Sequence, residues 1–145
     1  MDAKTRLFLV RGAVLFYFCL EGSLIGLWTA YVPYVQDHLN ISDTLLGSAI
    51  LFFYLGQVLG SPLAGLCLHY FGAKNSTGVG AILYATFLPV VAQANSFATL
   101  CLVFFTWGSA EVLLDVSMNT SGVIAEVEAG FPIVGFFHGS YSISA

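Results

Sequence analysis

Residues 99–124 read TLCLVFFTWGSAEVLLDVSMNTSGVI, an apolar run that contains two acidic residues, Glu111 and Asp115. A helix rises about 1.5 Å per residue, so it needs about 20 apolar residues to cross the roughly 30 Å hydrocarbon core of a bilayer. This run meets that length. Its composition therefore predicts a membrane-spanning helix that carries acids near its middle.

The rest of the chain has the same apolar character. Of its 145 residues, 58% are hydrophobic and 8% are charged, against about 45–50% and roughly 25% in ordinary soluble domains. So little charge cannot cover the surface of a soluble globule, and the aromatic content excludes a disordered chain. The 4 Lys and Arg residues are too few to neutralise a nucleic-acid backbone. The sequence predicts an all-α integral membrane protein.

Further apolar stretches, separated by turn-forming residues, predict more spanning helices. Besides 99–124, the sequence predicts complete transmembrane helices at about 7–35, 44–70 and 77–94. A fifth stretch, 133–145, is long enough for only about 20 Å of helix. It is either re-entrant or truncated, and we expect a truncated helix, because one cut within lipid leaves its last carbonyls unpaired. On that expectation, residues 1–145 form a partial N-terminal transmembrane domain.

The basic residues predict the orientation of the helices. Lys4, Arg6 and Arg11 precede or begin the first predicted helix, and Lys74 lies between the second and third. Cytoplasmic loops of membrane proteins are enriched in Lys and Arg. We therefore expect a multi-pass protein of the cell (inner or plasma) membrane with a cytoplasmic N-terminus. The acidic connection that contains Glu126 does not fit this pattern, although acidic residues contribute little to the rule.

Acidic residues inside the predicted helices are the strongest functional candidates. An ionised acid at the bilayer centre costs at least about 2.5 kcal/mol. Glu21 and Glu111 fall at the midpoints of the first and fourth predicted helices. Asp115 and Asn119 follow Glu111 at four-residue spacing, so these three side chains share one helix face. We expect all four residues to line the pathway of a solute or proton.

Such carboxyl groups have two possible roles. They can pass a proton from one side to the other and bind the hydroxyl groups of a polar solute, or they can simply pair with Arg11, Lys74 or a polar residue elsewhere. His138, in the last stretch, either extends the proton pathway or forms a hydrogen bond at the cytoplasmic end. No Cys or His cluster has the spacing of metal ligands, so we expect no metal and no cofactor.

Several stretches resemble the bacterial-type inner-membrane branch of the major facilitator superfamily. Residues 114–119, LDVSMN, are similar to an L-D-V-A-M-N stretch in the fourth helix of that family. Residues 131–133, FPI, and 137–139, FHG, followed by Ser142, resemble the opening of its fifth helix. The first helix is also similar, through Glu21, Gly22, Gly26, Trp28 and Pro33.

The stretch GLCLHYFGAK, residues 65–74, resembles the cytoplasmic G-x-x-x-D-R-x-G-R-R signature of the family. Only Gly65, Gly72 and Lys74 match it. The charged residues that latch the two halves of the family's transporters are replaced here by His69, Tyr70 and Ala73. The resemblance therefore implies a cytoplasmic gating motif that is reduced to the three matching residues.

The family resemblance implies a twelve-helix secondary transporter that moves a small solute by alternating access, with its site near the membrane midplane. We expect proton coupling, and as partners the solute, protons, the lipid bilayer and the missing C-terminal half of the same transporter. The alternative is a small non-transporting membrane assembly or scaffold protein, which would explain the short length but not the intramembrane acids. An enzyme that uses Asp115 and His138 is disfavoured, because no nucleophile motif or metal spacing accompanies them.

Overall fold

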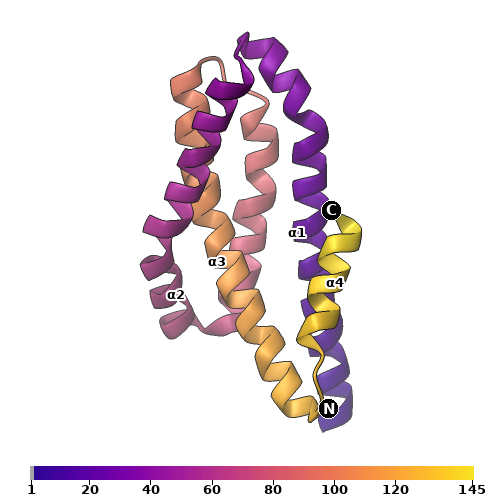
Figure 1. Ribbon diagram of the computed structural model, residues 1–145. Coiled ribbons are helices and arrows are strands. Elements are labelled where there is room, and N and C mark those ends of the chain that lie inside the picture. Colours follow the sequence, from indigo (N-terminus) through magenta and orange to yellow (C-terminus); the bar gives the residue numbers. More distant parts are fainter. Residues whose placement is uncertain (1) are drawn as a thin grey trace.

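The computed structural model describes residues 2–145, which form helices and contain no strand. The helices are α1 (Ala3–Leu39), α2 (Asp43–Val91), α3 (Phe97–Ala129) and α4 (Val134–Ser144) (Figure 1). The first three are long and apolar enough to cross a membrane. The all-helical membrane architecture predicted from composition is confirmed.

Short polar residues set where the helices begin and end. The side chains of Asp2, Ser42 and Ser96 each accept a hydrogen bond from a backbone N–H in the first turn, at 2.6, 3.3 and 3.2 Å. Each therefore satisfies one of the donors that a helix start leaves unpaired. Asn40 (φ 50°) and Gly130 (φ 74°) adopt left-handed backbone geometry, which ends α1 and α3. These boundaries fall in connections that the turn-forming residues predicted.

The predicted number of helices is wrong. The sequence predicts four complete spanning helices and a truncated fifth, whereas the described chain has four helices in all, three of them long enough to span. The predicted helices 44–70 and 77–94 are joined in the 49-residue α2, whose backbone leaves helical geometry at Gly72 (φ 73°, ψ 162°). Glycine has no Cβ and adopts this conformation without steric clash. The expected connection is therefore reduced to a single residue.

Gly72 allows α2 to fold back on itself. One arm, residues 43–71, runs away from the α1–α2 connection, and the return arm, residues 73–91, runs back towards the start of α3 (Figure 1). At about 1.5 Å per residue, each arm has about the length of one membrane crossing. A straight helix of 49 residues would be more than twice that length.

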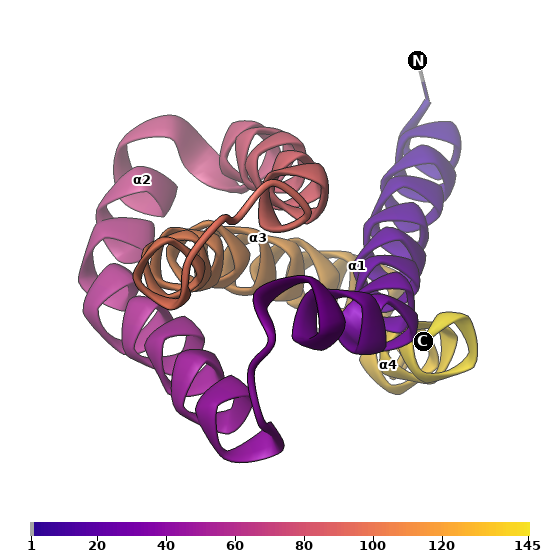
Figure 2. The ribbon, with the colours of Figure 1, turned by 90° about the horizontal axis from the view of Figure 1, so that it is seen from above.

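The central helix of the bundle is α3, which lies between the two arms of α2 and faces α1 (Figure 2). Half of its most apolar stretch is buried, against 28% for α1 and 11% for α2. It packs so closely on α2 that only glycine fits at two positions. A Cβ on Gly56 would collide with the carbonyl oxygen of Phe105, and one on Gly108 with that of Phe53. Glycines therefore mediate the close contact between these two helices, as small residues commonly do between helices in membranes.

The short helix α4 packs on α1 in a similar way. A Cβ on Gly22 would collide with the backbone of Tyr141. At the other end of α4, Glu126 Oε2 accepts hydrogen bonds from the backbone N–H groups of Ile133 (2.7 Å) and Val134 (2.8 Å). Glu126 therefore caps the start of α4, which gives a structural role to the acid that did not fit the charge pattern.

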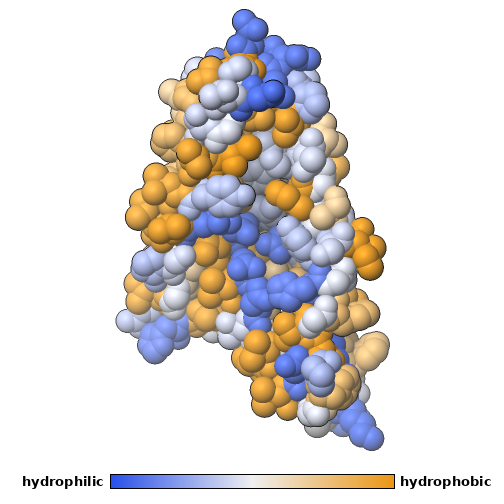
Figure 3. All heavy atoms as spheres, in the orientation of Figure 1, coloured by the Kyte–Doolittle hydropathy of each residue, from blue (hydrophilic) through white to orange (hydrophobic). Residues whose placement is uncertain are grey.

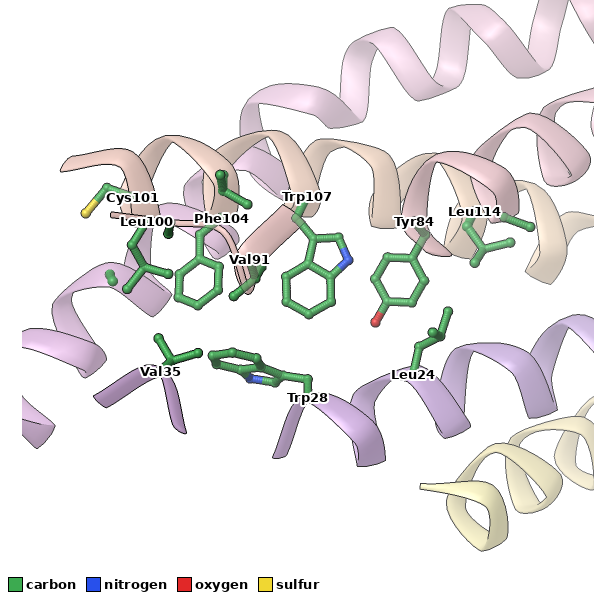
Figure 4. Packing of buried hydrophobic residues seen from close by; sticks show 14 of the residues in the cluster. Leu24, Trp28, Val35, Tyr84, Val91, Leu100, Cys101, Phe104, Trp107 and Leu114 are labelled. Atoms are coloured by element: carbon green, nitrogen blue, oxygen red, sulfur yellow. The ribbon is translucent and has the colours of Figure 1, made fainter. Parts of the chain in front are cut away.

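Aromatic side chains fill the space between α1 and α3. Trp28 of α1 meets Phe104 and Trp107 of α3 edge-on, with ring centroids 5.1 and 5.8 Å apart. Tyr84 of the return arm stacks on Trp107 at 5.6 Å, and its hydroxyl points towards α1 (Figure 4). This cluster holds α1 and α3 in register, and so sets the depth at which their polar residues meet.

Candidate functional site

Glu21 of α1 and Glu111 of α3 meet within the bundle. Glu21 is 6% exposed and Glu111 is partly buried. Their carboxyl groups come within hydrogen-bonding reach of each other. Figure 3 shows hydrophilic residues gathered in a hollow at mid-height, between apolar flanks. The structure therefore brings together the two acids that counting along the helices placed at one depth.

Gln57 of α2 holds the carboxyl group of Glu111. Its Nε2 donates a hydrogen bond of 2.5 Å to Glu111 Oε2. Its neighbour in sequence, Gly56, is fixed against α3, and the Gly56 carbonyl accepts a hydrogen bond of 3.1 Å from Ser109 Oγ. Our sequence analysis missed Gln57, although an amide within the apolar stretch 44–70 was a signal that could have identified it.

Asp115 is the centre of a second polar group, one helical turn from Glu111. Asn119 Nδ2 donates hydrogen bonds to Asp115 Oδ1 (2.8 Å) and to the Asp115 carbonyl (2.9 Å). His138 of α4 lies close enough to Asp115 for their charges to interact, and its ring packs edge-on against Phe18 with centroids 4.9 Å apart. The histidine therefore lies beside Asp115, while its own side chain stays exposed.

Two tyrosines complete the polar surroundings of the acids. The Tyr84 hydroxyl lies near enough to Glu21 and Glu111 to interact with them electrostatically, and the Tyr141 hydroxyl of α4 near enough to both of these acids and Asp115. Tyr84 was not predicted. A tyrosine in an apolar helix is no signal by itself, and its depth depends on how α2 turns at Gly72.

The basic residues do not neutralise these acids. Within residues 2–145, the ion pair that forms joins Arg6 to Glu128, at 3.9 Å. Arg11 lies over the ring of Phe131, 5.0 Å from its centroid. The alternative in which Arg11 or Lys74 pairs with a buried acid is therefore not what the structure shows. In the same part of the chain, no group of three or more His, Cys, Asp or Glu side chains could hold a metal ion.

The residues of the reduced signature lie in and near the fold-back of α2. Gly72 has the positive φ that favours glycine. Gly65 has open space around it, because no atom lies within 4 Å of an added Cβ. Lys74 is exposed and lines a cavity together with Arg6. Of the three residues, Gly72 has a clear conformational requirement.

The chain is similar to several known membrane proteins. It is 27% identical over 126 residues to an uncharacterized MFS-type transporter of Yersinia pestis, a match that covers 87% of this chain and 33% of that protein. It is 31% identical over 131 residues to membrane protein MosC of Rhizobium meliloti, covering 90% and 32%. It is 26% identical over 118 residues to the hexuronate transporter of Bacillus subtilis, covering 74% and 28%.

The chain spans about a third of the length of the curated relatives that it matches. No family model and no solved structure matches it. Its relatives are named as transporters or membrane proteins, and three of its helices can span a membrane, so it is a multi-pass membrane protein. Its similarity to an MFS-type transporter, over 87% of the chain, agrees with the resemblance of its fourth and fifth predicted helices to the major facilitator superfamily.

Proposed function

We propose that the protein acts in secondary active transport of a small solute, by alternating access and with coupling to protons. The observation that carries the proposal is the meeting of Glu21 and Glu111, from two helices, within the bundle and with Gln57 bound to one of them. Facing carboxyl groups can exchange a proton with each other and bind the hydroxyl groups of a solute. Acids at this depth mark proton and substrate pathways in many membrane proteins.

The names of the relatives support transport rather than scaffolding, because three of them are called transporters. Since these proteins are about three times as long as the matched region, we propose that activity belongs to a larger bundle. In that bundle these helices would form part of the N-terminal half, and a C-terminal half of the same transporter would supply the other wall of the pathway. Secondary transporters of this kind bind solute near the midplane, between repeats.

We assign different roles to the two polar groups. Glu21 and Glu111 would carry the coupling proton and contact the solute. Asp115 lies about 6 Å further along α3, one helical turn, and with Asn119 and His138 it would orient the end of the pathway nearer the N-terminus. Gly65, Gly72 and Lys74 would act in gating, through the fold-back of α2.

The test is uptake into proteoliposomes by the complete transporter, with labelled glucuronate as the first solute because one relative is named a hexuronate transporter. Glu21→Gln or Glu111→Gln should abolish accumulation against a pH gradient and leave counterflow largely intact, because exchange needs no net proton movement. Asp115→Asn should weaken both activities. Glu128→Gln is the control, since Glu128 lies outside the site on the same helix as Glu111. Full accumulation by both Glu21→Gln and Glu111→Gln would exclude these acids as the coupling groups.

We also propose that the protein lies in the cell membrane with its N-terminus in the cytoplasm. Lys74 follows the fold-back of α2, at the end of the bundle where the N-terminus also lies (Figure 1), and basic residues mark the cytoplasmic side. In a variant without Cys19, Cys67 and Cys101, a cysteine at Asn40 should react with an impermeant thiol reagent on intact cells. A cysteine at Asn75 should stay unlabelled. Labelling at Asn75 alone would invert the orientation.

A further inference from the structure

A cavity of about 560 Å³ lies between α1, the return arm of α2 and α3, away from the buried acids. Its wall is mainly apolar and includes Val10, Val14 and Met118. Two basic side chains also line it, Arg6 from α1 and Lys74 from the return arm. A wall that combines apolar surface with two positive charges suits a ligand that has both an anionic and an apolar part.

The charges at this end of the molecule favour an anionic ligand. Arg6 and Lys74 are two of the 4 basic residues of the chain, and the other two, Lys4 and Arg11, also belong to the N-terminal part of α1. The nearest counter-charge is Glu128, 3.9 Å from Arg6, in a pair whose side chains are 67% and 41% exposed. Such a long, exposed pair is weak and leaves Arg6 able to bind another anion.

The other two acids at this end are already used: Asp2 accepts the backbone N–H of Thr5, and Glu126 accepts two backbone N–H groups at the start of α4. Two hydroxyl groups of the cavity wall are also engaged: Thr77 donates to the Ala73 carbonyl (2.8 Å) and Ser121 to the Ser117 carbonyl (3.0 Å). The two basic side chains and the hydroxyl group of Tyr17 are therefore the donors available to a ligand. Residues 2–145 offer Lys74 no ion-pair partner.

We propose that this cavity binds one anionic phospholipid from the leaflet on the N-terminal side, with its phosphate between Arg6 and Lys74 and its acyl chains along the apolar wall. Basic pockets between transmembrane helices bind anionic headgroups in this way. Free phosphate would leave the apolar wall in water, so the lipid is the better match. None of its lining residues belongs to the acid cluster, and it shares only Lys74 with the residues to which we assign gating.

The experiment is native mass spectrometry of the detergent-purified protein, with phosphatidylglycerol or phosphatidylcholine added as the probe. We expect one phosphatidylglycerol molecule to be retained per protein, in preference to phosphatidylcholine. Each of Arg6→Gln and Lys74→Gln should weaken that preference about fivefold, because the attraction of one basic residue to an anionic membrane surface changes binding by about this factor. Lys4→Gln is the matched control, because Lys4 carries the same charge on α1 but does not line the cavity.

Ala13→Phe tests whether the cavity itself is required, because Ala13 lines it and a larger side chain would fill it without changing any charge. Loss of the retained lipid in this variant supports the proposal. A preference for phosphatidylglycerol in the double variant Arg6→Gln/Lys74→Gln as strong as in the unchanged protein, or unchanged lipid retention in Ala13→Phe, would overturn it. Displacement of the lipid by inorganic phosphate alone would show a simple anion site instead.

Discussion

The two sides of α3 are built differently. Against α2, glycines bring backbone onto backbone, at Gly56 and Gly108. Against α1, long side chains fill the space: aromatic rings around Trp107 and the carboxyl groups of Glu21 and Glu111. A contact between backbones has few alternative arrangements, whereas side chains can change rotamer. For the proposed transport function, we therefore expect α2 and α3 to move as one body and the rearrangement to occur between α3 and α1.

The two kinds of contact lie next to each other on α2. Gly56 packs against the Phe105 carbonyl, while Gln57, the next residue, reaches the carboxyl group of Glu111. The close contact therefore supports the polar one, because it fixes the backbone from which the Gln57 side chain extends. If this is correct, changes in the glycine contact should affect folding, and changes at Gln57 should affect transport.

The largest effect is expected at the glycine contact. Gly108→Ala places a Cβ against the Phe53 carbonyl, and overpacking of this kind destabilises by about 3 kcal/mol. The control is Gly47→Ala, because Gly47 also lies in a helix but has no atom within 4 Å of an added Cβ. Thermal unfolding in detergent, followed by tryptophan fluorescence, should show a lower Tm for Gly108→Ala only. Equal Tm values would mean that α2 and α3 can separate slightly without loss of stability.

Gln57→Ala should have a smaller effect on stability and a clear effect on transport. It removes the donor to Glu111 Oε2, and an unsatisfied buried acceptor costs about 1–3 kcal/mol. We expect proton-driven uptake to fall about tenfold, the equivalent of about 1.4 kcal/mol. Gln93→Ala is a matched control, because Gln93 donates to the Pro89 carbonyl near the end of the return arm. If both variants transport equally well, Gln57 has no role in holding the acid.

The sequence predicts the depth of a residue along its own helix better than it predicts which residues of different helices come into contact. The depths of Glu21 and Glu111 follow from counting residues within apolar runs, because the thickness of the bilayer fixes where a run must begin and end. The reversal of α2 at a single residue was not predicted, because the sequence around Gly72 was typical of a longer connection. Tyr84 was missed for the same reason, because the depth of the return arm depends on Gly72. Gln57 could have been noticed as an amide in an apolar run, but its partner depends on how glycine packing rotates α2 against α3.

The smallest expected effect concerns α4, which packs on α1, the helix that faces the acid-bearing side of α3. Glu126 accepts two backbone N–H groups at the start of α4, and loss of a cap of this type costs about 1 kcal/mol. Glu126→Ala should therefore loosen the first turn of α4 while leaving the contact between α2 and α3 unchanged. Hydrogen–deuterium exchange should show faster exchange at Ile133 and Val134 and no change around Gly108.

Glu128→Ala is the control, because Glu128 lies in the same last turn of α3 but pairs only with the exposed Arg6. Since His138 and Tyr141 both belong to α4, a loosened start should also move them relative to Asp115 and Glu21. A modest fall in transport, smaller than that of Gln57→Ala, would then accompany the faster exchange. Faster exchange without any change in transport would show that the polar groups of α1 and α3 function without a fixed α4.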